Sequence, residues 1–526
     1  MLNVPALEDH IREAMASEKV PALALVVVDR EGVVYANGFG TTANDSTGQP
    51  VTEETLFRIA STTKPFTATL IMRLAEEGLL DLDAPITYFA PTVRIGSPGD
   101  ADRVTPRMLL SHLSGLPPGG EELGHLGRNA LEEFTQLTLP NYVLVAPPGT
   151  LYSYSNPGFS LLGFLAEKVT GESFETLMAQ KVFEPLGLTR SFLDPLTALT
   201  YPTALPHRLN PQGELTPIHA FFDEPAARPA GFLITNVIDL AAFARMLLNG
   251  GATAKGRLLS EKSVAEMLSP QADLLTASGA SYGLGFFLRN SRGAKIAEHG
   301  GSMPTYEAEF SLAPEPGLAV MVLANRPLTG ELAKLTDRLW GELLDRQEKM
   351  ALVDEPQPPQ WDEVQFNAAI GTYVGGRRGL IRLLLEDGAP WLELNGRKAQ
   401  LSFARPGVYV GTLSGGGTVS VGLARREARD PVNYLLIEGV VCKRTELSEV
   451  VPPDRTVLRR LTGRYEGFDV IEVTLEEDRL VLVSQMHGTR RMPCVPLGGL
   501  RFACDYGVVE FLEDSEGEIA RMQVWD

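Results

Sequence analysis

The stretch that decides the fold is Phe57-Arg58-Ile59-Ala60-Ser61-Thr62-Thr63-Lys64, and an apolar pattern follows it directly. Apolar residues recur downstream at spacings of three and four, which predicts a helix that ends at Gly78. Ser61 therefore lies at a helix N-terminus, and Lys64 follows one turn later on the same face. A backbone N–H and a positive potential are also available at this end of a helix.

This pair of residues suits nucleophilic catalysis. A Ser hydroxyl is a weak nucleophile until a neighbouring base removes its proton. A Lys amine can assist where burial or neighbouring cations lower its pKa. The S-x-x-K spacing alone is weak support, because a capping Ser followed by a solvated Lys explains most matches. A catalytic site at Ser61 therefore needs further elements elsewhere in the chain.

Two later motifs offer such elements. Tyr154-Ser155-Asn156 lies in a loop before a predicted helix over 159–169. Its Tyr can relay protons, and its Asn can donate to a substrate carbonyl. His299-Gly300-Gly301-Ser302 ends a predicted strand over 294–298, and its glycines permit close backbone approach to a ligand or an oxyanion. Taken separately, a packed turn and a hairpin bend with a surface His are the simpler interpretations.

The order of predicted elements divides the chain into a long first region and a β-rich tail. A strand pair over 22–38 opens the first region and helices fill its middle. Strands return from a single strand over 282–289 to a last one over 318–324. A helix over 329–345 ends it. Strands at both ends with helices between them predict one sheet built from the two ends, with a helical insertion. The expected fold class is α+β, with an antiparallel sheet flanked by helices.

A Pro-rich polar segment separates the two regions. We place a first domain at 1–346 and a linker at 347–365, around Pro356-Gln357-Pro358-Pro359. The tail shows short alternating strands and a weak repeat that begins at Gly371 and again at Gly463. Two antiparallel β-barrels, over 366–450 and 455–526, would explain this pattern. One barrel over 366–526 is the alternative.

The composition excludes several classes of protein. The 526 residues are 44% apolar and 21% charged, which is typical of globular domains. A net charge of −19 argues against nucleic-acid binding, and no apolar run is long enough to span a membrane. Three cysteines, and a first twenty residues without the apolar region of a signal peptide, predict a cytoplasmic protein. The sequence contains neither metal-ligand spacing nor a phosphate-binding glycine motif, so we expect no metal and no cofactor.

In this order and spacing, the three motifs resemble the serine β-lactamase and penicillin-binding-protein superfamily. The likeness covers about residues 5–345 and is greatest for the branch of class C β-lactamases, D-aminopeptidases and family VIII esterases. It implies that Ser61 is the acylated nucleophile and that Lys64 and Tyr154 shuttle its proton as one coupled pair. Supporting stretches are Leu109–Leu116, which includes a His112 expected to pack, and also Pro148-Gly149, Pro229–Phe232 and Tyr282–Gly285.

The resemblance also implies how substrate is held. Asn156 would bind the acyl-side amide or carbonyl, and the backbone N–H groups of Ser61 and Ser302 would form an oxyanion hole. His299 stands where the family has the Lys of its K-T-G element, and Gly300 replaces the Thr. A neutral His is a weaker anion site than that Lys. We therefore expect an ester, or an amide of an amino-terminal residue, rather than a substrate with a free carboxylate there, with Gly301 allowing close approach.

The tail narrows the expected function. D-aminopeptidases of this branch carry two barrels after the catalytic domain, and lipocalin-like tails occur in related peptidases. We expect a serine hydrolase for small-molecule or short-peptide substrates, either a D-aminopeptidase or amidase or a carboxylesterase. The tail would narrow the cleft or mediate a homodimer. A β-lactamase or DD-carboxypeptidase is the alternative, and a catalytically inactive penicillin-binding-like sensor module is the alternative from another class.

A second serine also matches a nucleophile motif. Gly279-Ala280-Ser281-Tyr282-Gly283 fits G-x-S-x-G, which requires a buried strand before the Ser and a helix after it. Here a polar loop precedes the motif and a strand is predicted after it. We therefore do not expect Ser281 to be a nucleophile.

Overall fold

The chain forms two compact units. The computed structural model describes residues 2–119, 124–209, 214–328, 330–344, 363–424, 431–445, 453–466, 470–484, 491–504, 507–514 and 517–525. The first unit consists of Met1–Leu144, Ser155–Ala272 and Ala280–Asp354. The second consists of Val145–Tyr154, Asp273–Gly279 and Glu355–Asp526. The predicted linker at 347–365 lies outside the described residues, except for its last three.

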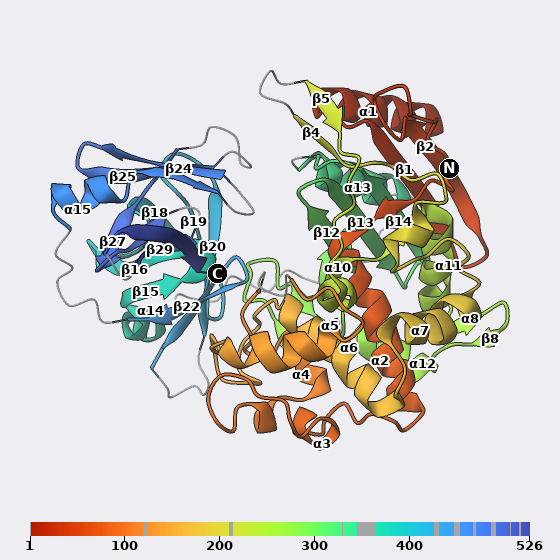
Figure 1. The fold of residues 1–526 in the computed structure, drawn as a ribbon, viewed down its shortest axis with the longest axis horizontal. Helices are drawn as coiled ribbons and strands as arrows, with labels where there is room; N and C mark the ends of the chain where they lie inside the picture. Colours follow the sequence, from red (N-terminus) through yellow and green to blue (C-terminus); the bar gives the residue numbers. More distant parts are fainter. Residues whose placement is uncertain are drawn as a thin grey trace. The chain divides into compact units, whose positions relative to one another are not determined.

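An eight-stranded sheet forms the centre of the first unit (Figure 1). Its strand order is β2-β1-β14-β13-β12-β11-β10-β9. Strand β1 from the start of the chain pairs antiparallel with β14 from the end of the unit, which confirms the predicted sheet built from both ends. The strands are β1 (Ala22–Asp29), β2 (Val33–Gly40), β9 (Ala272–Asp273), β10 (Ser281–Tyr282), β11 (Phe287–Ser291), β12 (Ala294–Met303), β13 (Tyr306–Ala313) and β14 (Leu318–Ala324).

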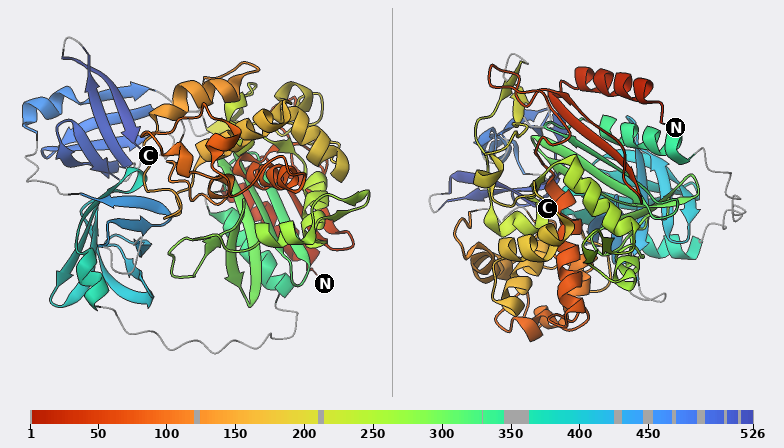
Figure 2. Two further views of the ribbon diagram at one scale, coloured as in Figure 1. Left: turned by 90° about the horizontal axis from the view of Figure 1, so that it is seen from below. Right: turned by 90° about the vertical axis from the view of Figure 1, so that its right-hand side faces the viewer.

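Helices cover both faces of this sheet, which explains the continuous apolar run in β1. Ala24 and Val26 belong to the core shared with α2 (Lys64–Glu76) and α11 (Val237–Leu248). Leu25, which points the other way, belongs to the core shared with α1 and α13. A strand buried on both faces has no polar side to alternate with. Figure 2 shows these two helical layers on opposite sides of the strands, with α1 (Val4–Ser17) and α13 (Glu331–Leu344) in one of them.

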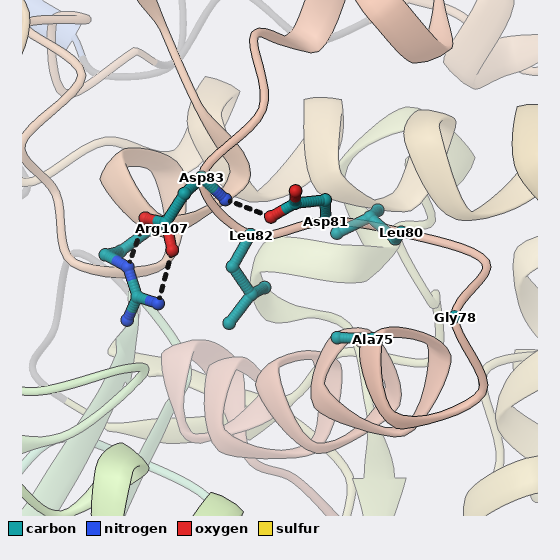
Figure 3. A pocket seen from close by; sticks show the side chains of 7 residues that line it. All are labelled: Ala75, Gly78, Leu80, Asp81, Leu82, Asp83 and Arg107. Carbon is teal, nitrogen blue, oxygen red and sulfur yellow. Dashed lines mark hydrogen bonds and ion pairs between the residues drawn. The ribbon is translucent and has the colours of Figure 1, made fainter.

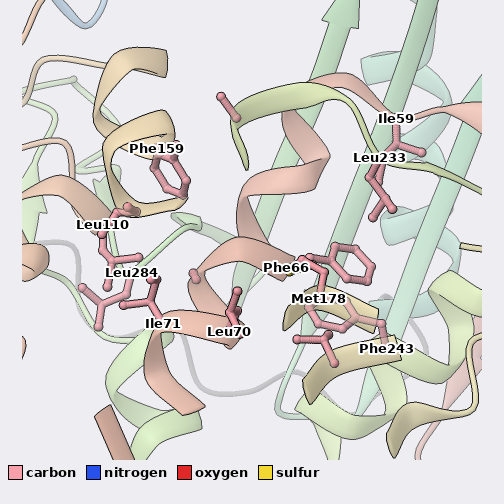
Figure 4. Close-up of a cluster of buried hydrophobic side chains, with 14 of the residues drawn as sticks. Ile59, Phe66, Leu70, Ile71, Leu110, Phe159, Met178, Leu233, Phe243 and Leu284 are labelled. Atoms are coloured by element: carbon pink, nitrogen blue, oxygen red, sulfur yellow. The ribbon is translucent and has the colours of Figure 1, made fainter. Parts of the chain in front are cut away.

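Helix α2 lies within the core of the first unit (Figure 4). The Phe66 ring is fully buried and stacks on Phe243 of α11, with the ring centroids 3.8 Å apart. Leu70 and Ile71 are also fully buried. Because most residues of α2 are buried, the helix is held by the packing around it rather than by one amphipathic face. The start of α2, where Ser61 lies, is therefore positioned by the surrounding core.

The helical insertion lies between β2 and β9. Helix α6 begins at Asn156, three residues before the predicted start, because Ser155 caps it: the Ser155 hydroxyl accepts the N–H of Gly158 at 3.1 Å. The other elements of this region are β3 (Phe57–Arg58), η1 (Ala60–Thr63), α3 (Ile86–Phe89), η2 (Ala101–Arg103), α4 (Pro106–Leu110), α5 (Ala130–Glu133), η3 (Phe134–Thr138), η4 (Leu139–Asn141), α6 (Asn156–Thr170), α7 (Phe174–Met178), η5 (Ala179–Phe183), α8 (Glu184–Leu186), α9 (Pro195–Ala198), β4 (His207–Leu209), β5 (Leu215–Pro217), η6 (Pro225–Ala227), α10 (Arg228–Gly231), β6 (Ile234–Thr235), β7 (Ala252–Thr253), β8 (Gly256–Arg257) and α12 (Glu261–Met267).

The second unit contains a closed barrel of eight antiparallel strands, which confirms the all-β tail. Strand β15 pairs with both β16 and β22, and this closes the barrel. The barrel strands are β15 (Gly371–Gly375), β16 (Gly379–Glu386), β17 (Ala389–Leu394), β18 (Arg397–Arg405), β19 (Val408–Thr412), β20 (Thr418–Ala424), β21 (Tyr434–Ile437) and β22 (Val440–Arg444), with α14 (Glu363–Ala369) before them and η7 (Gly376–Arg378) between β15 and β16.

Residues beyond the barrel form two further four-stranded sheets, so a second closed barrel over 455–526 stays a prediction. Leu480, Phe502 and Phe511 belong to one apolar core formed by strands of both sheets. The elements are α15 (Arg455–Arg460), β23 (Gly463–Glu466), β24 (Val470–Glu476), β25 (Arg479–Ser484), β26 (Arg491–Pro493), β27 (Val495–Gly498), β28 (Arg501–Cys504), β29 (Gly507–Glu513) and β30 (Ile519–Trp525).

Two short segments from the first region of the sequence belong to the second unit. Within Asp273–Gly279, the Asp273 carboxylate pairs with Arg405 of β18 at 2.7 Å, and Arg405 also donates to the Thr276 carbonyl at 2.7 Å. Tyr152, in the other segment, packs so closely on Gly439 that a Cβ there would lie 3.6 Å from its ring. A linear division of the chain at a linker does not anticipate this exchange of segments.

No helix within the described parts of the chain is both long enough and apolar enough to cross a membrane.

Replacing Phe66 with Ala tests the importance of the α2 core. The change removes a fully buried ring that stacks on Phe243, and we expect the free energy of unfolding to fall by about 3–5 kcal/mol. Tyr88→Ala is the control: Tyr88 is 77% exposed, and its loss should change stability by no more than about 0.5 kcal/mol. Urea denaturation measures both, and equal effects would contradict the packing described for α2.

Candidate active site

Ser61 lies in a tight turn that runs directly into α2. The 3₁₀ turn η1 ends at Thr63, and Lys64 is the first residue of the helix. Residues three apart eclipse one another in a 3₁₀ turn, so the side chains of Ser61 and Lys64 share one side. The Lys64 Nζ lies 3.1 Å from the Ser61 Oγ. Ala60 has a φ of +46°, a strained conformation for a residue with a side chain, directly before Ser61.

The amine of Lys64 is fully buried, and three hydrogen-bond contacts define its position. Besides Ser61, its Nζ contacts the Asn156 Oδ1 at 2.8 Å and the Ala230 carbonyl oxygen at 2.8 Å. Both of these oxygens only accept, so they take two hydrogens of the amine. The third direction points at the Ser61 hydroxyl. There an ammonium donates, whereas a neutral amine offers a lone pair that can accept the Ser61 proton.

The structure brings the predicted residues Ser61, Lys64 and Asn156 together. Asn156 is the first residue of α6 and directly follows the helix cap. Tyr154 stands two residues earlier in the chain and is partly exposed, but it belongs to the second unit. Its proximity to Ser61 stays a prediction.

The ring of His299 is buried in β12 and bonded on both sides. Its Nδ1 lies 2.7 Å from the Gly300 carbonyl oxygen, and its Nε2 lies 3.0 Å from the Tyr282 hydroxyl. A carbonyl only accepts, so we assign the hydrogen to Nδ1 and let Nε2 accept from Tyr282. Burial and the nearby Lys64 charge lower the His299 pKa to about 3, so the ring is neutral near pH 7.

This arrangement differs from the expectation that the His299 ring itself offers an anion site. Both of its nitrogens bind groups of the protein. A substrate site at this position would therefore consist of the strand backbone at Gly300–Ser302. Ser302 is exposed in β12, and its predicted part in an oxyanion hole stays a prediction.

Gly301 allows β12 to lie directly against the turn that carries Ser61. A Cβ at Gly301 would lie 2.0 Å from the Ile59 carbonyl oxygen and 2.9 Å from the Thr62 hydroxyl. The same Thr62 hydroxyl donates to the His299 carbonyl at 3.1 Å. Only a residue without a side chain fits this approach, which explains the role of the second glycine in the motif.

A segment around Ala230 completes the site, although no sequence pattern assigned it a role. The Thr67 hydroxyl donates to the Pro229 carbonyl at 2.7 Å, and the Leu233 N–H donates to the Thr63 hydroxyl at 3.1 Å. These bonds place the Ala230 carbonyl on Lys64. A backbone acceptor has no signature in residue types, so only the fold reveals it.

His112 is a second residue whose role the sequence did not reveal. It is fully buried, and its Nδ1 accepts the backbone N–H of Ser155 at 3.0 Å. Burial, with a smaller contribution from the charge of Lys64, holds its pKa well below the ordinary value of 6.5. The His112 ring therefore makes a specific hydrogen bond in addition to the packing expected of it.

Two other features of the chain are candidates for a functional site. Ser281 is in the short strand β10, paired with Leu288, without the strand–turn–helix setting of a nucleophile elbow. A surface pocket at the far end of α2 contains an Arg107–Asp83 ion pair with contacts of 2.6 and 2.9 Å (Figure 3). Ala75 in its wall is eleven residues beyond Lys64, or about 16 Å along the helix. Among the described residues, no cluster of His, Cys, Asp and Glu could hold a metal ion.

Comparison with known proteins identifies the family. Residues 7–345 match the family model described as "Beta-lactamase", which is well over half of the chain. The chain therefore belongs to the β-lactamase family. This family is part of a superfamily of serine hydrolases that also includes penicillin-binding proteins. Penicillin-binding protein 4 of Amycolatopsis lactamdurans is 30% identical over 351 residues, which cover 64% of this chain and 90% of that protein.

Solved structures show the same fold. The octameric penicillin-binding protein homologue from Pyrococcus abyssi is 27% identical, with a TM-score of 0.59, and the match covers 84% of this chain and all of that one. The structure of SurE with D-Leu is 24% identical, with a TM-score of 0.63 over 84% of this chain and 99% of that one.

Alanine at each glycine of the motif tests the close approach of β12. Gly301→Ala places a Cβ against the Ile59 backbone, and we expect it to cost about 1–3 kcal/mol or more of folding free energy. Gly300→Ala is the matched control, because its Cβ meets the Glu309 carboxylate at 3.2 Å instead of backbone. Thermal denaturation should rank Gly301→Ala as clearly the less stable variant, and the reverse order would contradict this packing.

The neutral state of His299 predicts a pH dependence of stability. The unfolded chain protonates this ring near its ordinary pKa of 6.5, whereas the folded protein resists protonation down to about pH 3. The unfolded state thus binds more protons between these values, and stability falls as pH falls. Between pH 7 and pH 5, protonation of His299 in the unfolded chain should lower the free energy of unfolding by about 2 kcal/mol.

His299→Gln removes this titration, since Gln carries no ionisable group. Urea denaturation at pH 7 and pH 5 should show that wild type loses about 2 kcal/mol more than the variant. An equal loss in both proteins would show that His299 is not held neutral.

Proposed function

We propose that this chain is a serine hydrolase that forms an acyl-enzyme on Ser61 and cleaves a small ester or amide. The observation that carries the proposal is the buried Lys64 amine, 3.1 Å from the Ser61 hydroxyl and held there by two fixed acceptors. A nucleophile paired with an oriented base is the arrangement that such catalysis requires.

In the proposed reaction, the Ser61 Oγ attacks the substrate carbonyl carbon while its proton passes to the coupled pair of Lys64 and Tyr154. The tetrahedral intermediate collapses, the bond to the leaving group breaks, and the same pair returns the proton to that group. A water molecule then attacks the acyl-enzyme, again with loss of a proton to the pair, and releases the acid and the Ser61 hydroxyl. The N–H groups of Ser61 and Ser302 would stabilise the developing oxyanion.

Asn156 would orient the substrate while it holds the base. Its Oδ1 accepts from Lys64, so its Nδ2 is the atom that would donate to an acyl-side carbonyl. One side chain would then join the base and the substrate, and the position of each would depend on the other.

The substrate proposed is one without a carboxylate at the β12 strand. The neutral His299 ring is bonded within the protein, so it supplies neither a charge nor a nitrogen for an anion. This favours an amide of an amino-terminal residue or a short ester. The SurE structure with D-Leu supports the D-amino-acid form, and we propose a D-aminopeptidase or amidase activity alongside esterase activity.

Penicillin recognition is the second candidate. The relative from Amycolatopsis is named a penicillin-binding protein, and the Pyrococcus structure is titled an octameric homologue of such proteins. We also propose that this chain self-associates, because the Pyrococcus homologue is titled octameric.

A substrate panel with variants tests the activity. We expect wild type to hydrolyse p-nitrophenyl acetate or D-alanine p-nitroanilide faster than nitrocefin, and D- faster than L-alanine p-nitroanilide. Ser61→Ala should abolish turnover, a loss of at least about 10³-fold, because it removes the nucleophile. Ser281→Ala is the matched control and should retain full activity.

A fluorophosphonate and a labelled penicillin separate the remaining alternatives. A mass increase on the peptide that contains Ser61 supports the acyl-enzyme. Faster turnover of nitrocefin than of the esters and amides would favour the β-lactamase alternative. No label at any dose, together with no turnover, would favour the inactive sensor module.

A further inference from the structure

The backbone N–H of Ser155 lies between two residues proposed to act on the substrate and its base. Ser155 is the cap of α6, and the N–H of a helix cap lies outside the helical hydrogen-bond ladder. Ser155 is fully buried, so water cannot satisfy this donor. Its acceptor is the Nδ1 of His112, at 3.0 Å. The next N–H along the chain, of Asn156, donates to the Pro118 carbonyl at 3.0 Å.

The His112 contact requires one state of the ring. An Nδ1 that accepts a hydrogen bond carries no hydrogen, so the hydrogen of the neutral ring lies on Nε2. A protonated ring has two donors and would turn an N–H toward the Ser155 N–H. Burial and the charge of Lys64 hold the pKa of this ring well below its ordinary value, so the acceptor persists through the physiological range.

The ring of His112 is held from several directions. Its centroid lies 4.8 Å from the Tyr282 ring and 5.3 Å from the Phe159 ring. Tyr282 is fully buried, and its hydroxyl is bonded to His299 in β12. The backbone of His112 has a φ of +58°, a left-handed conformation that costs energy for a residue with a side chain. A strained residue with a fixed ring is well suited to hold another group in place.

We propose that His112 is a positioning residue for the turn that carries Tyr154 and Asn156, an inference that rests on the proposed function. By accepting the Ser155 N–H, it fixes the start of α6 and keeps the Asn156 Oδ1 on the Lys64 amine. The residue acts through Ser155 and does not touch the substrate.

Three variants separate the acceptor from the ring. His112→Asn keeps an acceptor, because its Oδ1 occupies nearly the position of Nδ1, and Asn tolerates a positive φ. His112→Ala removes ring and acceptor, and His112→Phe keeps a ring without an acceptor. In the His112→Ala and His112→Phe variants, we expect kcat for the best panel substrate to fall about 10- to 100-fold, with KM changed less than about threefold. His112→Asn should recover most of kcat.

Hydrogen–deuterium exchange of the peptide around Ser155 tests the hydrogen bond between His112 and Ser155 independently of enzymatic activity. We expect faster exchange at Ser155 in His112→Ala and His112→Phe, and near-wild-type exchange in His112→Asn. Should His112→Ala fail to fold, the Asn and Phe variants make the same comparison. Thermal denaturation shows which variants are folded.

The outcomes distinguish this inference from the proposed function. The positioning role is overturned if exchange at Ser155 is unchanged in His112→Ala and His112→Phe. It is also overturned if both variants keep the wild-type kcat, even where Ser61 is labelled. Equal loss of kcat in Asn and Phe also overturns it, because the acceptor would then be irrelevant. If wild type neither turns over nor labels, the proposed function fails, and the role of His112 in catalysis fails with it, whatever the exchange shows.

Discussion

The buried amine of Lys64 is the interaction on which the rest of the site depends. A buried amine is costly unless polar groups surround it. Its three partners, Ser61, Asn156 and Ala230, come from segments far apart in the chain. The fold of the first unit therefore has to bring three regions to one point. Helix α2 provides the rigid position around which the others assemble, because most of its residues are buried in the core of the first unit.

The same amine explains the electrostatics of its neighbours. Two histidines, His112 and His299, are buried close enough to Lys64 for its charge to lower their pKa values. Burial disfavours a charge on either ring, and the charge of Lys64 adds to this effect, so both rings stay neutral and act as hydrogen-bonding groups. Tyr282 lies between them and bonds to His299. The neighbourhood of the proposed base thus combines one amine with polar but uncharged partners.

Much of the fold was predictable because it depends on local patterns. The apolar run Ala22–Val28 and the strands near residue 320 predicted a sheet joining both chain ends, and β1 pairs with β14. The expected single strand over 282–289 was wrong, since the chain turns away between β10 and β11. There Gly285 has a φ of +86°, and a Cβ would lie 2.8 Å from the Cβ of Ala68 in α2. Close packing of distant elements imposes this break, and strand propensity does not indicate it.

Local sequence patterns were enough to predict the residue types of the site, the spacing of Ser61 and Lys64, the family and the β-rich tail. Each of these follows from helix and strand periodicity or from motifs that a short stretch contains. Only the tertiary structure decided that the Ala230 carbonyl holds the amine, that His112 binds the Ser155 N–H, and that the His299 ring is enclosed within the protein. These contacts join backbone atoms and buried rings from separate segments. Their geometry depends on how the whole core packs, which no local pattern specifies.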